Sequence, residues 1–113
     1  MSVCVFCSIV AGDIPSSQVF ENEDFLAFHD IQPVAPIHVI VVPKVHSPSV
    51  AEFAQTSNAD FLAAIAQTAS LFEHNGYRVI FNTGSDAGQT EFHVHAHILA
   101  GERLSAMNGT VDK

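Results

Sequence analysis

The residues best suited to chemistry are three histidines at alternate positions, His93, His95 and His97. Successive side chains of a strand point to opposite faces, so an extended backbone over 92–99 presents all three imidazoles from one face. The other face is apolar and is predicted to pack: Phe92, Val94, Ala96 and Ile98. Imidazole acts as a base, a nucleophile or a metal ligand near neutral pH. We favour such a role over a solvated strand face, because Lys, Thr or Glu would serve solubility equally well.

The stretch 93–100, HVHAHILA, resembles the signature of the histidine triad (HIT) family of nucleotide hydrolases and transferases. Further stretches match the family in the same order and spacing: 6–15, 27–31, 35–38, 42–46 and 82–89. Together they resemble the small single-domain branch that acts on purine nucleoside phosphoramidates. The resemblance implies an α+β fold with a mostly antiparallel five-stranded sheet, one long helix and one short helix. It also implies a homodimer in which the sheet continues across a two-fold axis.

The length, hydrophobic pattern and net charge of the chain limit these expectations. A length of 113 residues has room for one core, and we expect a HIT domain over 1–101 and a C-terminal tail over 102–113. Apolar runs stay well short of the ~20 residues of a membrane-spanning helix, and the first ten residues lack a secretory pattern. These features predict a cytoplasmic protein. The net charge of −8 argues against nucleic acid as a partner.

Hydrophobic periodicity and turn residues predict the elements around the triad. A short helix in 6–11 ends at Gly12, and a helical turn is expected over 49–54. A long helix with one buried face begins at a cap in 58–60 and ends at Asn75-Gly76. The remaining strands are expected at 19–21, 25–28, 37–42 and 77–82, the first two as a hairpin.

Cys4 and Cys7 are the two cysteines, and their spacing fits a redox pair, half of a metal site or two buried thiols. Zinc held by two thiolates and two imidazoles is a common structural solution. In relatives that carry this pair, the resemblance implies two more ligands, here His46 and His93. We therefore expect a structural zinc ion. We expect no magnesium requirement, because no carboxylate cluster suited to that ion is visible.

Two further groups of residues match substrate-binding positions of the family. The resemblance implies a nucleoside pocket in which a carboxylate accepts the ribose hydroxyls and apolar side chains enclose a purine: Phe6, Ile9, Phe28, His29, Asp30 and Ile31. It also implies phosphate contacts from the loop after the fourth strand and from the triad: Asn82, Gly88, Gln89, Thr90, His95 and His97. Glycines let the backbone of such a loop approach a ligand closely.

The resemblance implies displacement at the α-phosphorus of a purine nucleoside phosphoramidate, which is an AMP or GMP derivative, or of an acyl- or aminoacyl-adenylate. His95 attacks and forms a nucleotidyl-histidine that water hydrolyses, while His97 holds phosphate oxygens. His38 and His93 orient the nucleophile and tune its pKa. Hydrolysis of dinucleoside polyphosphates, nucleotidyl transfer and a non-catalytic nucleotide-binding role remain open. Outside the family, alternate strand positions also suit a catalytic zinc ion held by three histidines.

Three features depart from the family pattern. Glu91 stands where relatives usually carry an apolar or small residue, and it brings negative charge close to the expected phosphate site. Ala87 replaces a common Gly, which questions whether the loop can reach positive φ there. The segment 102–113 lacks the aromatic-containing ending that shapes substrate choice in eukaryotic relatives.

Overall fold

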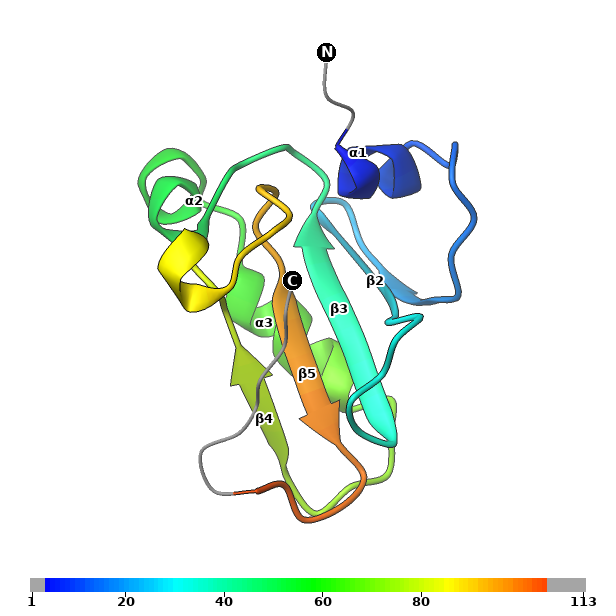
Figure 1. The fold of residues 1–113 in the computed structure, drawn as a ribbon. Helices are drawn as coiled ribbons and strands as arrows, with labels where there is room; N and C mark the ends of the chain where they lie inside the picture. The colour runs from blue at the N-terminus through cyan, green and yellow to red at the C-terminus, as the bar shows by residue number, and fades with distance from the viewer. Residues whose placement is uncertain (1–3, 106–113) are drawn as a thin grey trace.

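Five antiparallel strands form one sheet in the computed structural model, which describes residues 4–105 (Figure 1). The strand order is β1-β2-β3-β5-β4, so β1 and β4 are the edges. The bounds are Gln18–Glu21 for β1, Phe25–His29 for β2, Ile37–Pro43 for β3, Tyr77–Ile80 for β4 and Ala96–Ala100 for β5. The predicted α+β class and five-stranded antiparallel sheet are confirmed.

The helices in the described part of the chain are α1 Val5–Val10, α2 Val50–Thr56, α3 Phe61–Ala69 and the short 3₁₀ helix η1 Ser85–Ala87. The predicted cap of the long helix is confirmed, because the Asp60 carboxylate accepts from the Ala63 N–H group at 2.9 Å. α3 ends at Ala69, earlier than the predicted Asn75. The reason is local: the Leu71 N–H group already bonds to the Thr68 carbonyl in a tighter turn.

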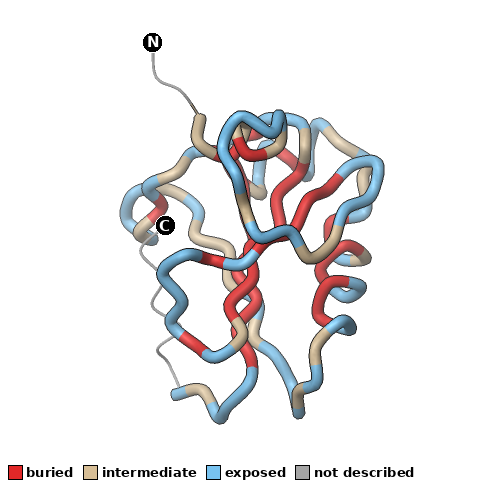
Figure 2. Tube along the Cα trace, turned by 90° about the vertical axis from the view of Figure 1, so that its right-hand side faces the viewer, coloured by how far each residue is buried: buried red, intermediate tan, exposed pale blue. Residues whose placement is uncertain are grey.

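The sheet separates two apolar clusters built from alternate residues of the same strands. On one face, Val39 and Val41 of β3 pack against α3. On the opposite face, Ile40 and Val42 of β3 pack with Phe6 of α1. Buried residues accordingly follow the strands and the side of α3 that faces them (Figure 2). One sheet thus offers a structural face against α3 and a second face on which α1 covers only part of the surface.

The triad follows the predicted alternation, but its strand is shorter than predicted. The apolar residues between the histidines belong to the cluster against α3, and the three imidazoles are on the other face, 0–3% exposed. β5 begins only at Ala96, so His93 and His95 lie in the segment before it. The prediction that Phe92 packs is wrong: this residue precedes the sheet and is 51% exposed. β4 likewise ends at Ile80 rather than at residue 82.

Part of the predicted C-terminal tail is described. Leu104 packs against Ala35 and Leu99 at one end of the sheet. The rest of the tail, residues 106–113, lies outside the described residues. Among residues 4–105, no helix combines the length and the apolar character that crossing a bilayer requires.

The Asp60 cap yields a stability prediction. Replacing Asp60 with Ala leaves the Ala63 N–H group without its acceptor, so the free energy of unfolding should fall by about 1 kcal/mol. Asp60→Asn keeps an acceptor oxygen and should retain most of the stability. Urea denaturation of the three proteins measures the difference. Equal midpoints would show that the cap does not stabilise α3.

Candidate active site

A main-chain hydrogen bond fixes the ring of His95. Its Nδ1–H group donates to the carbonyl oxygen of His93 at 2.8 Å. One nitrogen of a neutral imidazole carries the proton and the other carries the lone pair, so Nε2 of His95 carries the lone pair. The Phe6 ring of α1 lies against this imidazole, with ring centroids 4.8 Å apart. His95 is therefore a buried imidazole whose Nε2 is suited to act as a nucleophile or base.

A chain of hydrogen bonds gives His97 the opposite tautomer. The Val34 N–H group donates to Nδ1 of His38 at 3.1 Å, so the His38 proton is on Nε2. This Nε2–H group donates to Nδ1 of His97 at 2.9 Å, and Oδ2 of Asp30 lies 3.2 Å from the same His38 nitrogen. His97 is consequently protonated on Nε2. Two neighbouring imidazoles thus differ in function, since His95 offers a lone pair and His97 offers a proton.

These contacts argue against a metal ion held by the triad. Two imidazole ligands of tetrahedral zinc stand about 3.3 Å apart, given Zn–N bonds of about 2.0–2.1 Å. Asp30, His38 and His97 lie close enough together to be candidate metal ligands, but the facing nitrogens of His38 and His97 are 2.9 Å apart, which is a hydrogen-bond distance. His93 faces two thiols, whereas His95 bonds to the main chain. The alternative of a catalytic zinc ion held by His93, His95 and a third imidazole is not supported, because both nitrogens of His93 are engaged elsewhere.

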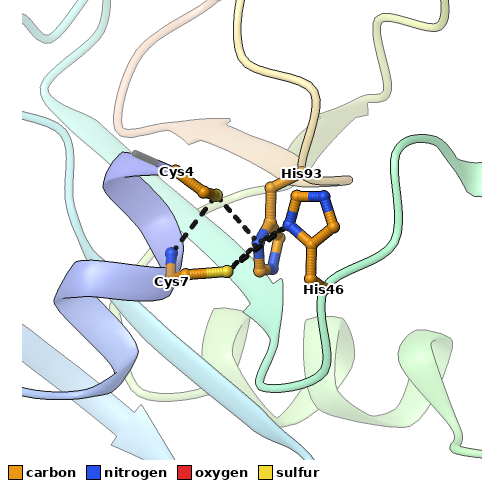
Figure 3. Close-up of side chains that lie close together, drawn as sticks. All are labelled: Cys4, Cys7, His46 and His93. Atoms are coloured by element: carbon orange, nitrogen blue, oxygen red, sulfur yellow. Dashed lines mark hydrogen bonds between the residues drawn. The ribbon is translucent and has the colours of Figure 1, made fainter. Parts of the chain in front are cut away.

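The four residues of the predicted metal site meet at the start of α1 (Figure 3). Nδ1 of His93 lies 3.3 Å from Sγ of Cys4 and 3.4 Å from Sγ of Cys7. Nδ1 of His46 lies 3.4 Å from Sγ of Cys7 and 3.3 Å from Nδ1 of His93. In a zinc tetrahedron these separations are about 3.6 Å for sulfur to nitrogen and about 3.3 Å for nitrogen to nitrogen. The cluster could therefore hold a metal ion.

The surroundings of this cluster prepare His93 as a ligand. Its Nε2–H group donates to the Pro43 carbonyl at 2.8 Å, which leaves the lone pair on Nδ1 beside the thiols. Burial lowers the pKa of His93, so the ring stays neutral. Burial and the neighbouring Cys4 raise the pKa of the Cys7 thiol to about 11. A metal ion that binds there must displace the thiol proton.

The six residues predicted to contact the nucleoside line one cleft of about 410 Å³: Phe6, Ile9, Phe28, His29, Asp30 and Ile31. Thr90 and Glu91 line the same cleft. The sequence-based prediction missed other lining residues: Val5, Ile14, Pro15, Ser16, Gln32 and Ile40. Ile40 could have been found, because its spacing from His38 in the predicted strand places both side chains on one face. A larger hollow, about 770 Å³, lies between residues 73–78 and 101–104 and contains none of the predicted site residues.

The loop between β4 and the triad makes its sharp turns at glycines. Gly84 and Gly88 have φ of 86° and 89°, in the region that favours glycine. Ala87 lies within η1 and is not at positive φ. The replacement of a common Gly by Ala87 therefore causes no backbone strain.

The side chain of Gln89 ties three main-chain segments together. Its Oε1 accepts from the Gly84 N–H group at 2.8 Å. Its Nε2 donates to the carbonyls of Pro48 at 2.8 Å and of Glu91 at 3.0 Å. The residue is buried, and both amide hydrogens and the oxygen are engaged. Gln89 thus shapes the loop whose flanking residue Thr90 is a predicted phosphate donor.

Replacing Gln89 with Ala removes these three bonds. Amides 84–91 should then exchange with deuterium at least about tenfold faster, because each bond contributes about 1 kcal/mol to closing the loop. Mass-spectrometric hydrogen exchange measures the change, and Gln67→Ala on the exposed side of α3 is the control. Unchanged protection of this loop would contradict the role given to Gln89.

Comparisons with known proteins agree with the motifs. The HIT domain family model matches residues 11–104. Protein hit of Bacillus subtilis (strain 168) is 42% identical over 100 residues, covering 85% of this chain and 69% of that protein. A histidine triad protein from Clostridium difficile is 39% identical with a TM-score of 0.82, covering 96% of this chain and 100% of the other. A HIT family hydrolase from Legionella pneumophila Philadelphia 1 is 34% identical with a TM-score of 0.76, covering 95% and 100%. By motif, sequence and fold, this chain belongs to the HIT domain family.

Proposed function

We propose that this protein is a nucleotide hydrolase that acts at the α-phosphorus of purine nucleoside phosphoramidates, or of acyl- and aminoacyl-adenylates. The observation that carries the proposal is the bond from Nδ1–H of His95 to the His93 carbonyl, which leaves the lone pair on Nε2. A phosphorus centre needs a nucleophile of this kind. Membership of the HIT family and the likeness to a HIT family hydrolase support hydrolysis as the reaction class.

In the first step, Nε2 of His95 attacks the α-phosphorus and the bond from phosphorus to the leaving amine breaks. The Nε2–H group of His97 donates a hydrogen bond to a phosphate oxygen together with Asn82 and Thr90, and the departing amine takes its proton from solvent. The nucleotidyl-imidazole of His95 carries positive charge. The His93 carbonyl faces Nδ1–H at 2.8 Å, so its dipole stabilises that charge.

In the second step, water attacks phosphorus and the bond from phosphorus to Nε2 of His95 breaks. The product is a nucleoside monophosphate, and the proton released by the attacking water goes to solvent, which replaces the proton taken by the amine. The contact between His38 and His97 keeps the His97 ring in the orientation that directs Nε2–H toward the phosphate. We therefore propose that His38 and His93 are positioning residues of the reaction, as the sequence predicts.

We propose that the cleft of about 410 Å³ binds the nucleoside. This volume lies within the range of about 300–1,000 Å³ that small-molecule sites occupy. Phe6 and Ile9 of α1 and Phe28 of β2 offer a purine one continuous apolar surface, since the rings of Phe6 and Phe28 contact each other with centroids 5.9 Å apart. Asp30 supplies a carboxylate for the ribose hydroxyls.

We propose that zinc is the metal of the cluster formed by Cys4, Cys7, His46 and His93. Two thiolates and two imidazoles fill a tetrahedron and leave no position for water or substrate, so the ion has a structural role. The ligands come from the start of α1, from the turn after β3 and from the triad segment. Zinc would cross-link these three segments.

We further propose that two chains pair through β4, which is an edge strand. Exposed apolar side chains occur on β4 and on or next to α3: Leu62, Leu71, Tyr77 and Val79. Burying them in a partner adds core to a small domain. A cytoplasmic location and the lack of a nucleic-acid partner stay predictions from the sequence.

His95→Asn tests the nucleophile. The variant should fold but lose at least about 10³-fold in kcat/KM on adenosine and guanosine 5′-phosphoramidates, because an amide does not attack phosphorus. Mass spectrometry should detect an acid-labile adduct during turnover, in which one nucleotidyl group is attached to the protein. The wild type should form this adduct and the variant should not. His74→Asn, outside the site, is the control.

Three outcomes would contradict the proposal in different ways. Retained turnover in His95→Asn would rule out this nucleophile. Preferred turnover of diadenosine polyphosphates would assign the protein to a different reaction of the family. Tight binding of nucleoside monophosphate without turnover of any substrate would indicate a non-catalytic binding protein.

Cys7→Ser tests the metal. Wild-type protein should contain one zinc ion per chain by elemental analysis, and the variant little. At about 100 times Kd, zinc stabilises the fold by about 2.7 kcal/mol, or about 10–20 °C in Tm. The raised pKa of the Cys7 thiol means that protons compete with zinc, so chelators should remove the ion faster as pH falls.

Ser8→Ala, in the same helix, is the control for Cys7→Ser. Calorimetry and activity are followed together after chelation, and activity should decline only as the protein unfolds. Immediate loss of activity in protein that is still folded would contradict a structural role.

A further inference from the structure

Glu91 places a carboxylate in the wall of a mainly apolar cleft. It lines the cleft together with Phe6, Ile9 and Phe28. Glu91 is half-buried, and no cation within residues 4–105 forms an ion pair with it. The resemblance to the family predicts an apolar or small residue at this position. An acidic side chain there needs an explanation in terms of what the cleft binds.

The other carboxylate of the cleft, Asp30, is held in place by the protein. Its Oδ1 accepts from the Gln32 N–H group at 2.8 Å, and its Oδ2 lies 3.2 Å from Nε2 of His38. The Asp30 side chain is 1% exposed. Glu91 differs, because it is only half-buried where it lines the cleft, and its main-chain carbonyl is anchored by Gln89. Glu91 is thus the more accessible anionic acceptor for a bound molecule.

The sheet register indicates which part of a nucleotide meets Glu91. Ile40 of β3 pairs with Phe28 of β2 on one side and with His97 of β5 on the other. Neighbouring strands are about 4.8 Å apart, so Phe28 lies about 10 Å from His97 across the sheet. A nucleotide whose α-phosphate lies at the triad therefore places its base over Ile40 and Phe28. Glu91 lines the cleft that contains Ile40 and Phe28, the part of the site proposed for the nucleoside, and its neighbour Thr90 marks the phosphate end of the same cleft.

We propose that Glu91 selects guanine over adenine by accepting hydrogen bonds from N1–H and the N2 amino group. An ionised carboxylate only accepts hydrogen bonds, and its two oxygens match two adjacent donors. Guanine presents such a pair of donors on this edge. Adenine presents one donor at N6 beside the acceptor N1, whose lone pair repels the carboxylate. The inference rests on the proposed function, since it specifies the base of the same substrate.

The test compares kcat/KM for guanosine, inosine and adenosine 5′-phosphoramidates that share one uncharged amine. The wild type should prefer guanosine to adenosine by about 10- to 100-fold, as a bidentate contact does. Inosine keeps N1–H but lacks the N2 amino group, so it should fall between them. A wild type that prefers adenosine would overturn the proposal.

Two substitutions at Glu91 separate the effect of the carboxylate's charge from the effect of its shape. Glu91→Gln presents one donor and one acceptor, which match N1 and N6 of adenine, so the preference should move to adenosine. Glu91→Val should give similar rates for both bases. Glu23→Gln, an exposed carboxylate outside the cleft, should keep the guanosine preference. An unchanged guanosine-to-adenosine ratio in Glu91→Gln would overturn the role of Glu91 while leaving the proposed function intact.

Calorimetric measurement of GMP and AMP binding distinguishes a failure of the base selection from a failure of the proposed reaction. If no phosphoramidate is hydrolysed but Glu91→Gln still reverses the GMP-to-AMP affinity ratio, the base selection holds and the proposed reaction fails. The substrates are also prepared with an amine that carries a second, cationic amino group. If Glu91→Gln changes the preference between charged and uncharged amines and not the base ratio, Glu91 recognises the leaving group and the proposal is wrong.

Discussion

The candidate active site depends on one short hydrogen bond, from Nδ1–H of His95 to the carbonyl oxygen of His93. This bond decides which ring nitrogen of His95 carries the lone pair. It also joins the triad to the candidate metal cluster, because the residue that supplies the carbonyl also directs its ring to the thiols of Cys4 and Cys7. The ring of His93 is fixed further by the Pro43 carbonyl. The candidate metal site and the triad thus share one residue.

The segment that follows β3 connects these parts. Its carbonyls accept from the His93 ring at Pro43, from the Val94 N–H group at Ser47 and from the Gln89 side chain at Pro48. His46 of the same segment belongs to the metal cluster. The triad segment, the loop before it and the start of α1 are therefore positioned against one stretch of main chain. Such convergence fixes the positions of side chains that lie on irregular segments.

The electrostatics of the site are local. The chain carries a net charge of −8, and no lysine or arginine lines the cleft among the described residues. The anionic substrate that we propose would therefore be held by neutral donors, such as Nε2–H of His97, rather than by the overall field. In a cleft without such cations, the single carboxylate of Glu91 would then have a strong influence on which nucleoside fits.

The sequence by itself determined the alternation of the triad, the cap of α3 and the elements of the sheet, because these follow from periodicity and from motifs of nearby residues. The resemblance to the family added six residues of the cleft, and only the fold supplied the others. The sequence did not determine that β5 begins at Ala96 or that Phe92 stays exposed, since the first residue of a strand depends on where the neighbouring strands offer hydrogen-bond partners. Only the tertiary structure decided the tautomers of His95 and His97 and the engagement of the Gln89 amide. The contact of Cys4 with His93 was suggested by resemblance, but its distance came from the fold. The physical reason is that the alternation of side chains along a strand is a local property of the backbone. The ring nitrogen that carries the proton of a histidine instead depends on hydrogen-bond partners that strand register brings close.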